Sequence, residues 1–244
     1  MTLDRQDFEI LKEFHFDIPP IGVKYLVAAP HTMNPLGERM ALCEMMKKAQ
    51  GGDIFYAQAK DHTCEAGQYI LGQRQIEDQF VSGQFGAGLG LFREERAAAR
   101  LYHYIPRIAK GVVNYVAFSP FDRLPFDPDV LIVIANTDQM EILLRAMSYE
   151  TGQMWSSRYS PAMGCSWLFA YPHLTGEINF IATGLGFGMR RRKLFPQGLH
   201  FMTIPFDRLP SMMQTLKEMP WVPEPFKPNG LTYVKELRQR LGLE

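Results

Sequence analysis

The six residues Val130-Leu131-Ile132-Val133-Ile134-Ala135 are the longest aliphatic run in this chain of 244 residues. An uninterrupted apolar run of this length, without polar alternation, predicts a buried strand. It is far too short to cross a bilayer, which takes about 20 residues. The predicted fold is therefore organised around one buried strand in the second half of the chain.

Helices and strands alternate on both sides of this run. A helix over 138–149 follows it, with Asn136 or Thr137 as the capping residue. Other predicted strands are 21–28, 54–59, 112–118, 178–183 and 199–204, and other predicted helices are 4–14, 34–50, 93–104, 160–171 and 209–219. This order predicts an α+β or α/β fold and a mixed sheet with flanking helices, for which two pseudo-related halves are one option.

Residues 1–219 are expected to form one globular body, with 1–110 and 111–219 as candidate halves. Residues 220–244 are expected to form a proline-rich connector and a C-terminal helix, which either docks on the body or pairs with a second subunit. The segment Pro-Phe-Asp-Arg-Leu-Pro occurs twice, from Pro120 and from Pro205, each time after a predicted strand. A shared strand-exit turn is the favoured interpretation, and a duplicated strand–turn unit is the alternative.

The charge balance disfavours nucleic-acid binding. Lys+Arg and Asp+Glu number 26 each, so the chain lacks the basic excess typical of such proteins. The polar N-terminus has no apolar stretch, from which we expect no signal peptide, and we expect no membrane segment. Three cysteines without a CxxC pair predict reduced thiols rather than disulfides, and hence a cytoplasmic protein.

Several segments, taken in order, resemble one known family. They are Pro19-Pro20-Ile21-Gly22-Val23-Lys24, Cys43 with Ala49-Gln50-Gly51, Cys64-Glu65-Ala66-Gly67 with Leu71-Gly72, Phe126-Asp127-Pro128-Asp129-Val130, and Gly164-Cys165 with Thr175-Gly176. On these motifs the chain resembles the DUF169 family, an uncharacterised group best represented in archaea and anaerobic bacteria. The similarity covers nearly the whole chain, apart from the C-terminal helix.

The resemblance implies that Cys43, Cys64 and Cys165 occupy family cysteine positions. It supplies no settled activity. Other members often have a further cysteine where this chain reads Ala182-Thr183-Gly184, so the resemblance does not imply a four-cysteine site here.

Three roles remain open for the cysteines. They could be the ligands of an iron–sulfur cluster, in which three thiolates leave one iron open to a substrate. They could bind zinc, with His62 as a nitrogen ligand. They could also be small core residues, because free cysteine is often buried and Cys43 lies beside an apolar helical stripe.

A glycine- and arginine-rich segment is the candidate anion site. Gly186 and Gly188 follow a predicted strand and precede the basic residues Arg190, Arg191 and Arg192. Backbone N–H groups could approach a phosphate here while the arginines neutralise its charge. The alternative, which is favoured, is a flexible turn with a solvated basic run.

The leading prediction is a cytoplasmic metalloprotein, an enzyme of anaerobic metabolism, with a three-cysteine iron–sulfur centre that binds a small anionic substrate. The reaction is not predicted. The first alternative is a non-catalytic protein that binds a small ligand or cofactor, with structural cysteines. The second is a zinc-stabilised assembly factor. The predicted partners are a small-molecule substrate and a second copy of the chain, in a homodimer.

Overall fold

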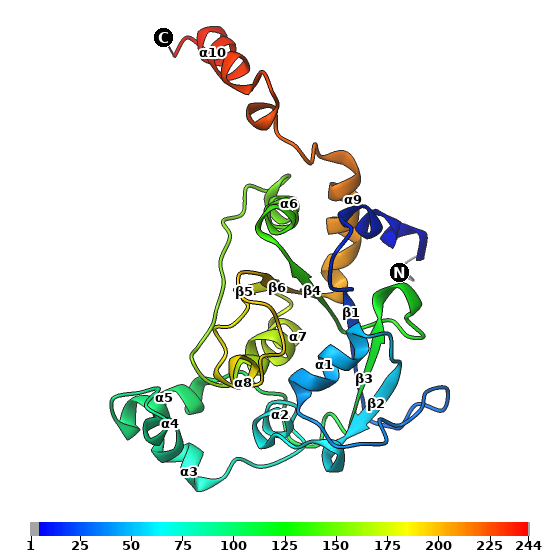
Figure 1. Ribbon diagram of the computed structural model, residues 1–244, viewed down its shortest axis with the longest axis vertical. Helices are drawn as coiled ribbons and strands as arrows, with labels where there is room; N and C mark the ends of the chain where they lie inside the picture. The colour runs from blue at the N-terminus through cyan, green and yellow to red at the C-terminus, as the bar shows by residue number, and fades with distance from the viewer. Residues whose placement is uncertain (1–4, 244) are drawn as a thin grey trace.

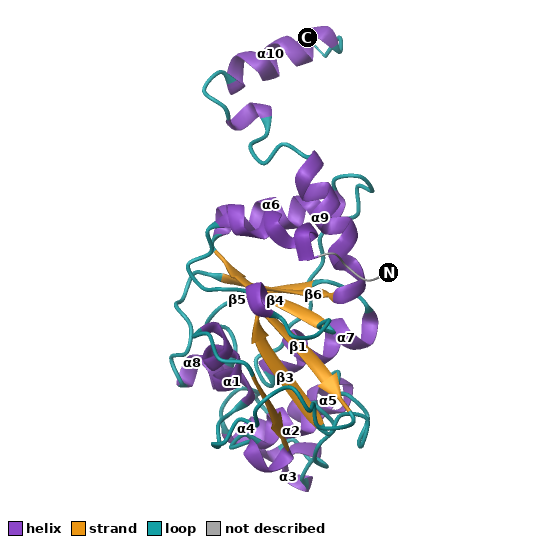
Figure 2. Cartoon of the chain, turned by 90° about the vertical axis from the view of Figure 1, so that its right-hand side faces the viewer, coloured by secondary structure: helices purple, strands orange, loops and turns teal. Residues whose placement is uncertain are grey.

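The computed structural model describes residues 5–243 and consists of a six-stranded sheet with helices on both faces (Figures 1 and 2). The strands lie in the order β2-β3-β1-β4-β6-β5. They are β1 (Ile21–Leu26), β2 (Phe55–Gln58), β3 (Tyr115–Pro120), β4 (Val130–Ala135), β5 (Asn179–Ala182) and β6 (His200–Pro205). Among the described residues every pairing of these strands is antiparallel, and two isolated bridges are parallel. The fold is therefore α+β, the first of the two predicted classes.

Ten α-helices are described, together with shorter helical segments. The α-helices are α1 (Leu42–Gln50), α2 (Glu65–Ile70), α3 (Asp78–Val81), α4 (Gln84–Gly88), α5 (Glu95–Tyr104), α6 (Thr137–Ser148), α7 (Tyr171–Thr175), α8 (Phe187–Arg191), α9 (Leu209–Glu218) and α10 (Gly230–Arg240). The 3-10 helices are η1 (Arg5–Phe14), η2 (Ala59–Asp61), η3 (Phe121–Arg123), η5 (Phe206–Arg208) and η6 (Glu224–Phe226), and η4 (Ser166–Ala170) is a π-helix. The helix predicted over 4–14 corresponds to η1, and Asp4 lies outside the described residues.

The aliphatic run forms β4, which is buried on both faces of the sheet. Its even-numbered residues belong to the core under α1 and η4, and its odd-numbered residues belong to the core under η1, α6 and α9. A fully buried aliphatic side chain contributes about 1.5–3 kcal/mol, so both layers of helices are held to this strand. The two covered faces explain why an antiparallel strand has no polar alternation.

The two repeated segments occupy equivalent places in the sheet. β1 pairs with β3 so that Ile21 lies opposite Pro120, and β4 pairs with β6 so that Val130 lies opposite Pro205. Each proline ends its strand and is followed by a 3-10 turn, η3 or η5. The repeat is therefore a strand-exit turn, as predicted, and it stands in the same register in both halves.

The edge strands extend this equivalence. Phe55 of β2 and Asn179 of β5 each lie opposite the residue two places before the repeated proline. In the central pair, β1 and β4 run antiparallel with Gly22 opposite Leu131. A pseudo-twofold axis through that pair relates β2-β3-β1 to β5-β6-β4. The first of these units contains β1, β2 and β3, and the second contains β4, β5 and β6.

One predicted helix start is wrong. The sequence predicted a helix from Asn34 with Pro35 in its first turn, but α1 begins at Leu42. The preceding segment is extended beside β2 instead: the Tyr56 N–H donates to the Asn34 carbonyl at 3.0 Å, and the Leu36 N–H donates to the Tyr56 carbonyl at 2.7 Å. Pairing with the edge strand thus overrides the local helix signal, because it satisfies backbone groups on both segments.

Helices α3, α4 and α5 form a lobe at the end of the molecule opposite α10 (Figures 1 and 2). Phe80, Ala98 and Tyr102 are buried in its small core. Gly83 connects α3 to α4 with a φ of 85°, a conformation that L side chains rarely adopt. The lobe therefore depends on glycine at this turn.

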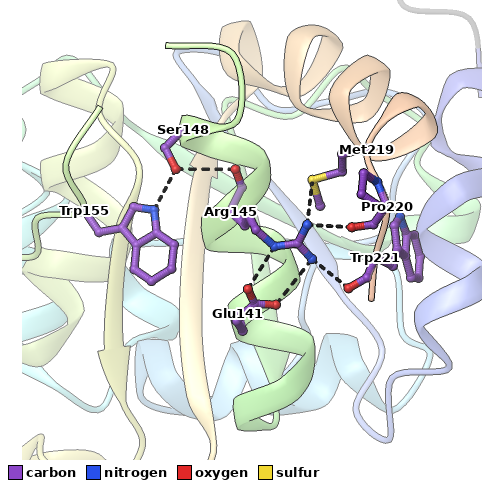
Figure 3. A network of polar contacts seen from close by, with 7 residues as sticks. All are labelled: Glu141, Arg145, Ser148, Trp155, Met219, Pro220 and Trp221. Atoms are coloured by element: carbon purple, nitrogen blue, oxygen red, sulfur yellow. Dashed lines mark hydrogen bonds and ion pairs between the residues drawn. The ribbon is translucent and has the colours of Figure 1, made fainter. Parts of the chain in front are cut away.

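Arg145 on α6 holds the start of the C-terminal segment (Figure 3). Its guanidinium donates to the carbonyls of Pro220 and Trp221, both at 2.6 Å, and pairs with Glu141 at 2.9 Å. The Trp221 ring packs against Phe14, with ring centroids 4.4 Å apart. The chain is thereby attached to both α6 and η1 as it leaves α9.

Residues 222–243 form the C-terminal arm, which extends away from the body and includes η6 and α10 (Figure 1). Its apolar side chains are largely exposed, among them Phe226 at 73% and Leu231 at 89%. In the part of the chain described, no helix has the length and apolar character needed to cross a membrane.

Candidate thiol site

The three cysteines lie at the starts of three helices. Cys43 is the second residue of α1, and Cys64 is the N-cap of α2. Cys165 is the second residue of the helical stretch 164–175, which consists of two α-helical residues, η4 and α7. The sequence predicted this helix four residues earlier. α1 and the 164–175 stretch each lead to the edge strand of their unit, so Cys43 and Cys165 each lie in the first turn of the helix that precedes that strand.

The fold brings the three thiols into one neighbourhood. Cys165 interacts electrostatically with both Cys64 and Cys43, and Cys43 interacts with Cys64. Burial raises the pKa of Cys43 to about 11 and raises the pKa of Cys165 well above its usual value, and the neighbouring thiols act in the same direction. Thiols held in the neutral form are weak nucleophiles. The environment therefore does not favour covalent catalysis, and a bound metal would have to stabilise the thiolate forms.

The backbone around Cys165 is unusual. Met163 has a φ of 52°, in the left-handed region that non-glycine residues rarely occupy. The π-helical segment η4 begins directly after Cys165, and the Ser166 hydroxyl donates to the Pro106 carbonyl. π-helical turns and strained residues are enriched at functional sites. Both features occur within three residues of this thiol.

Tyr159 fills the space beside two glycines next to this helix start. A Cβ built on Gly164 would lie 3.0 Å from the Tyr159 hydroxyl, and one on Gly186 would lie 2.5 Å from it. Burial, and secondarily Cys165, raises the pKa of Tyr159 above its usual value. The phenol therefore remains a neutral hydrogen-bonding group at the wall of the thiol site, and Gly186 is required by close packing.

Arg192 connects the second unit to α1. Its Nε lies 3.4 Å from a carboxylate oxygen of Glu44, and its Nη1 donates to the Gly188 carbonyl at 3.3 Å. Its positive charge opposes the effect of burial by lowering the pKa of Cys43. One cation of the predicted anion segment is thus an electrostatic neighbour of the thiols.

The other two arginines of that segment are placed differently. Arg190 lines a separate hollow of about 70 Å³ together with Lys193. Arg191 is exposed at the end of α8. The helix α8 forms where the favoured sequence interpretation was a flexible turn. The structure therefore does not direct the three arginines to one common point.

His62 is a buried imidazole near the start of α2. Its side chain is only 2% exposed, and neither ring nitrogen has a hydrogen-bond partner within residues 5–243. Its Nδ1 would lie 3.5 Å from a Cβ built on Gly67, which places the ring against α2. Burial lowers its pKa to about 4, against a smaller opposite effect of Asp61. The neutral ring therefore retains an available nitrogen lone pair.

Thr183, in the segment considered above for a further family cysteine, is not available as a ligand. Thr183 is buried, and its hydroxyl donates to the Pro196 carbonyl and accepts from the Leu199 N–H at 3.2 Å. Nor do any three His, Cys, Asp or Glu side chains, among the residues described, form a group that could hold a single metal ion. The available thiolate donors are the three cysteines alone.

A family model agrees with the resemblance seen in the sequence. The model of DUF169, described as an uncharacterised ArCR family, matches residues 9–215. The chain belongs to the DUF169 family. No curated protein and no solved structure matches it significantly. The family assignment therefore comes without an activity, and the function of this DUF169 protein has to be argued from its own residues.

Several residues of the site in this DUF169 protein were not identified from the sequence. Tyr159 and Met163 belong to no recognisable sequence motif, because their positions depend on packing between the two units. Glu44 was also missed, although its place three residues after Ala41 is a capping-box signal: its carboxylate accepts the Ala41 N–H at 2.6 Å. The capping role of Glu44 could be inferred from the local sequence. Its second role, as the ion-pair partner of Arg192, could be seen only in the folded structure.

Proposed function

We propose that this DUF169 protein is a metalloprotein whose Cys43, Cys64 and Cys165 are the thiolate ligands of an iron–sulfur centre. The observation that supports the proposal is that three thiols, 21 and 101 residues apart in sequence, contact one core cluster and interact with one another electrostatically. Core packing alone would also place these residues together, so metal analysis is needed to distinguish the two explanations. Iron–sulfur clusters are held by cysteine thiolates, and three ligands leave one iron open.

A cluster fits these thiols better than a single ion does. A cluster distributes its ligands over several irons, so its cysteines need not surround one point. When bound, such a centre would supply an open iron that polarises a substrate oxygen or sulfur. The reducing cytoplasm required to maintain these thiols is part of the same proposal.

Arg192 and Tyr159 would contribute to substrate binding. Arg192 supplies a positive charge beside Cys43, and this charge favours a small anionic substrate. Its Glu44 partner, at 3.4 Å, holds the guanidinium in place while leaving other donors of the five-donor fork available. Tyr159, beside Cys165, would donate a hydrogen bond from a phenol that stays protonated.

Zinc binding is a second candidate, favoured by one specific observation, although the described side chains would have to rearrange to surround a single ion. The two ring nitrogens of His62 are buried without partners among the described residues, and His62 lies two residues before Cys64. Leaving such a group unsatisfied costs about 1–3 kcal/mol, which a ligand would recover. Zinc commonly takes two or three thiolates and one histidine. In this case the protein would be a zinc-stabilised assembly factor.

Anaerobic purification followed by metal analysis distinguishes the candidates. An iron–sulfur centre predicts a brown protein with equivalent iron and labile sulfide, both lost in Cys64→Ser and retained in Thr63→Ala. Thr63 is exposed and adjacent, so Thr63→Ala controls for a general disturbance of the loop. Stoichiometric zinc that is lost in His62→Gln supports the zinc alternative. A colourless protein without iron, sulfide or zinc contradicts both and leaves the cysteines as core residues of a ligand-binding protein.

A further inference from the structure

A basic cavity lies on the α3–α5 lobe, apart from the thiols. Its volume is about 670 Å³, within the range of small-molecule sites. It is lined by Tyr69, Ile76, Val81, Arg96, Ala99, Arg100, Tyr102, His103, Tyr104 and Arg107. The lining contains three arginines and no carboxylate, in a protein whose overall charge is zero. The local excess of positive charge therefore requires an explanation of its own.

The basic side chains share one face of α5. Arg96, Arg100 and His103 are separated by four and three residues, so they project from the same side of the helix. Like charges at this spacing destabilise a helix by about 0.2–0.5 kcal/mol per pair. Neither Arg96 nor Arg100 has a hydrogen bond or ion pair with another residue of the described chain. By contrast, Arg74 pairs with Glu65 at 3.2 Å and also with Glu77.

Aromatic rings form the other part of the cavity. Tyr69, Tyr102 and Tyr104 line it, and the Arg107 guanidinium lies over the Tyr69 ring at 5.3 Å from the centroid. Tyr102 is buried and fixed, whereas Tyr104 is 72% exposed and lies at the rim. Flat rings and guanidinium planes stack on aromatic bases, and arginines recognise phosphates by paired hydrogen bonds.

From this combination we infer that the cavity binds a nucleoside diphosphate or a related phosphorylated aromatic compound. The arginines of α5 would hold the phosphates, and the tyrosines would hold the ring. The cavity is open to solvent but local, with a volume of about 670 Å³, and the chain is neutral; both features favour a small molecule over single-stranded RNA, which is bound along extended basic grooves. The inference does not depend on metal binding by the cysteines.

The cavity is connected to the thiol site through α2. Tyr69 lies five residues after Cys64, which corresponds to about 7.5 Å along the helix axis. A ligand against Tyr69 would therefore contact the helix whose N-cap is a proposed metal ligand. Because the cavity and the thiol site share α2, the cavity is suited to a cofactor or substrate that is used at the thiol site.

Titration calorimetry of the full chain in low salt tests the inference. The probes are ADP, GDP and flavin mononucleotide, with pyrophosphate and adenosine as the separate charged and aromatic parts. We expect at least one nucleotide to bind, and Arg100→Gln to raise its Kd about tenfold, equivalent to one charge-assisted hydrogen bond. Arg93→Gln is the matched control, because Arg93 is exposed just before α5 and does not line the cavity.

Each other outcome contradicts the inference. Absence of binding by all three nucleotides at millimolar concentration would exclude the site. Pyrophosphate binding as tightly as the nucleotides would show an anion site to which the tyrosines contribute nothing. A uridine oligonucleotide that binds more tightly than every nucleotide would assign the surface to RNA. Equal effects of Arg100→Gln and Arg93→Gln would show that binding occurs elsewhere.

Discussion

Replacing Arg145 with alanine should detach the start of the C-terminal segment. The guanidinium is only 16% exposed and forms two hydrogen bonds to main-chain carbonyls at 2.6 Å, besides its ion pair with Glu141 (Figure 3). Hydrogen bonds to charged groups contribute about 1.5–3 kcal/mol each, and the helical ion pair contributes about 0.3–0.5 kcal/mol.

The expected loss is smaller than the sum of these contributions. Once Pro220 and Trp221 move away, water can solvate their carbonyls, so part of the hydrogen-bond free energy is recovered. Contact between Trp221 and Phe14 is lost at the same time. We expect the Arg145→Ala substitution to lower the free energy of unfolding by about 2–4 kcal/mol.

Urea denaturation followed by tryptophan fluorescence measures this change. Emission of the folded variant should also shift to the red, because the half-buried Trp221 becomes exposed. Arg145→Lys should fall between the wild type and the alanine variant, since lysine keeps the charge but cannot bond both carbonyls as a planar fork. Arg240→Ala, the same change at an exposed position of α10, is the control. A loss below about 0.5 kcal/mol in Arg145→Ala would refute the reasoning.

Three further predictions concern the lobe, the thiol site and the arm. Gly83→Ala should increase hydrogen exchange throughout the α3–α5 lobe, because Gly83 has a φ of 85° and the added methyl group would collide with the α5 backbone. Gly88→Ala is the control: its methyl group would meet open space, so this substitution should stabilise α4 by about 0.5–1 kcal/mol. Gly186→Ala should displace Tyr159 and lower the metal content several-fold, and Gly188→Ala, where a methyl group has ordinary contacts, should not. Removal of the C-terminal arm should convert the predicted homodimer, of twice 28.0 kDa for the full chain, into a monomer by light scattering; a mass equal to two truncated chains would exclude the arm from the dimer interface.

The sequence predicted the centre of this fold well. A continuous aliphatic run is a local signal, and so are the Asn136 cap and the apolar stripe of α6; the structure has the Asn136 side chain accepting the Gln139 N–H at 2.9 Å. The start of α1 was not predictable in the same way. Asn34 and Pro35 favour a helix locally, but hydrogen bonds to Tyr56, twenty residues away, determine their conformation. Such pairing leaves no trace in local periodicity.

The candidate site was less predictable than the fold. The cysteines could be named from the sequence, but their proximity depends on how two strand units pair across the pseudo-twofold axis. The positive φ of Met163 and the π-helix after Cys165 are imposed by packing, and no residue type at these positions requires them. The Arg192–Glu44 contact joins the two units and was invisible for the same reason.

The duplicated units explain the asymmetry of the site. Equivalent helices place Cys43 and Cys165 at corresponding points, so a symmetric site would have two thiols and two matching neighbours. The neighbours differ: α2, after β2, has Cys64 as its N-cap, whereas α8, after β5, leads to Arg192. One unit thus adds a thiol and the other adds a cation. For the proposed three-thiolate centre, this division would leave one iron without a protein ligand, and the positive charge of Arg192 beside Cys43 would attract an anion to it.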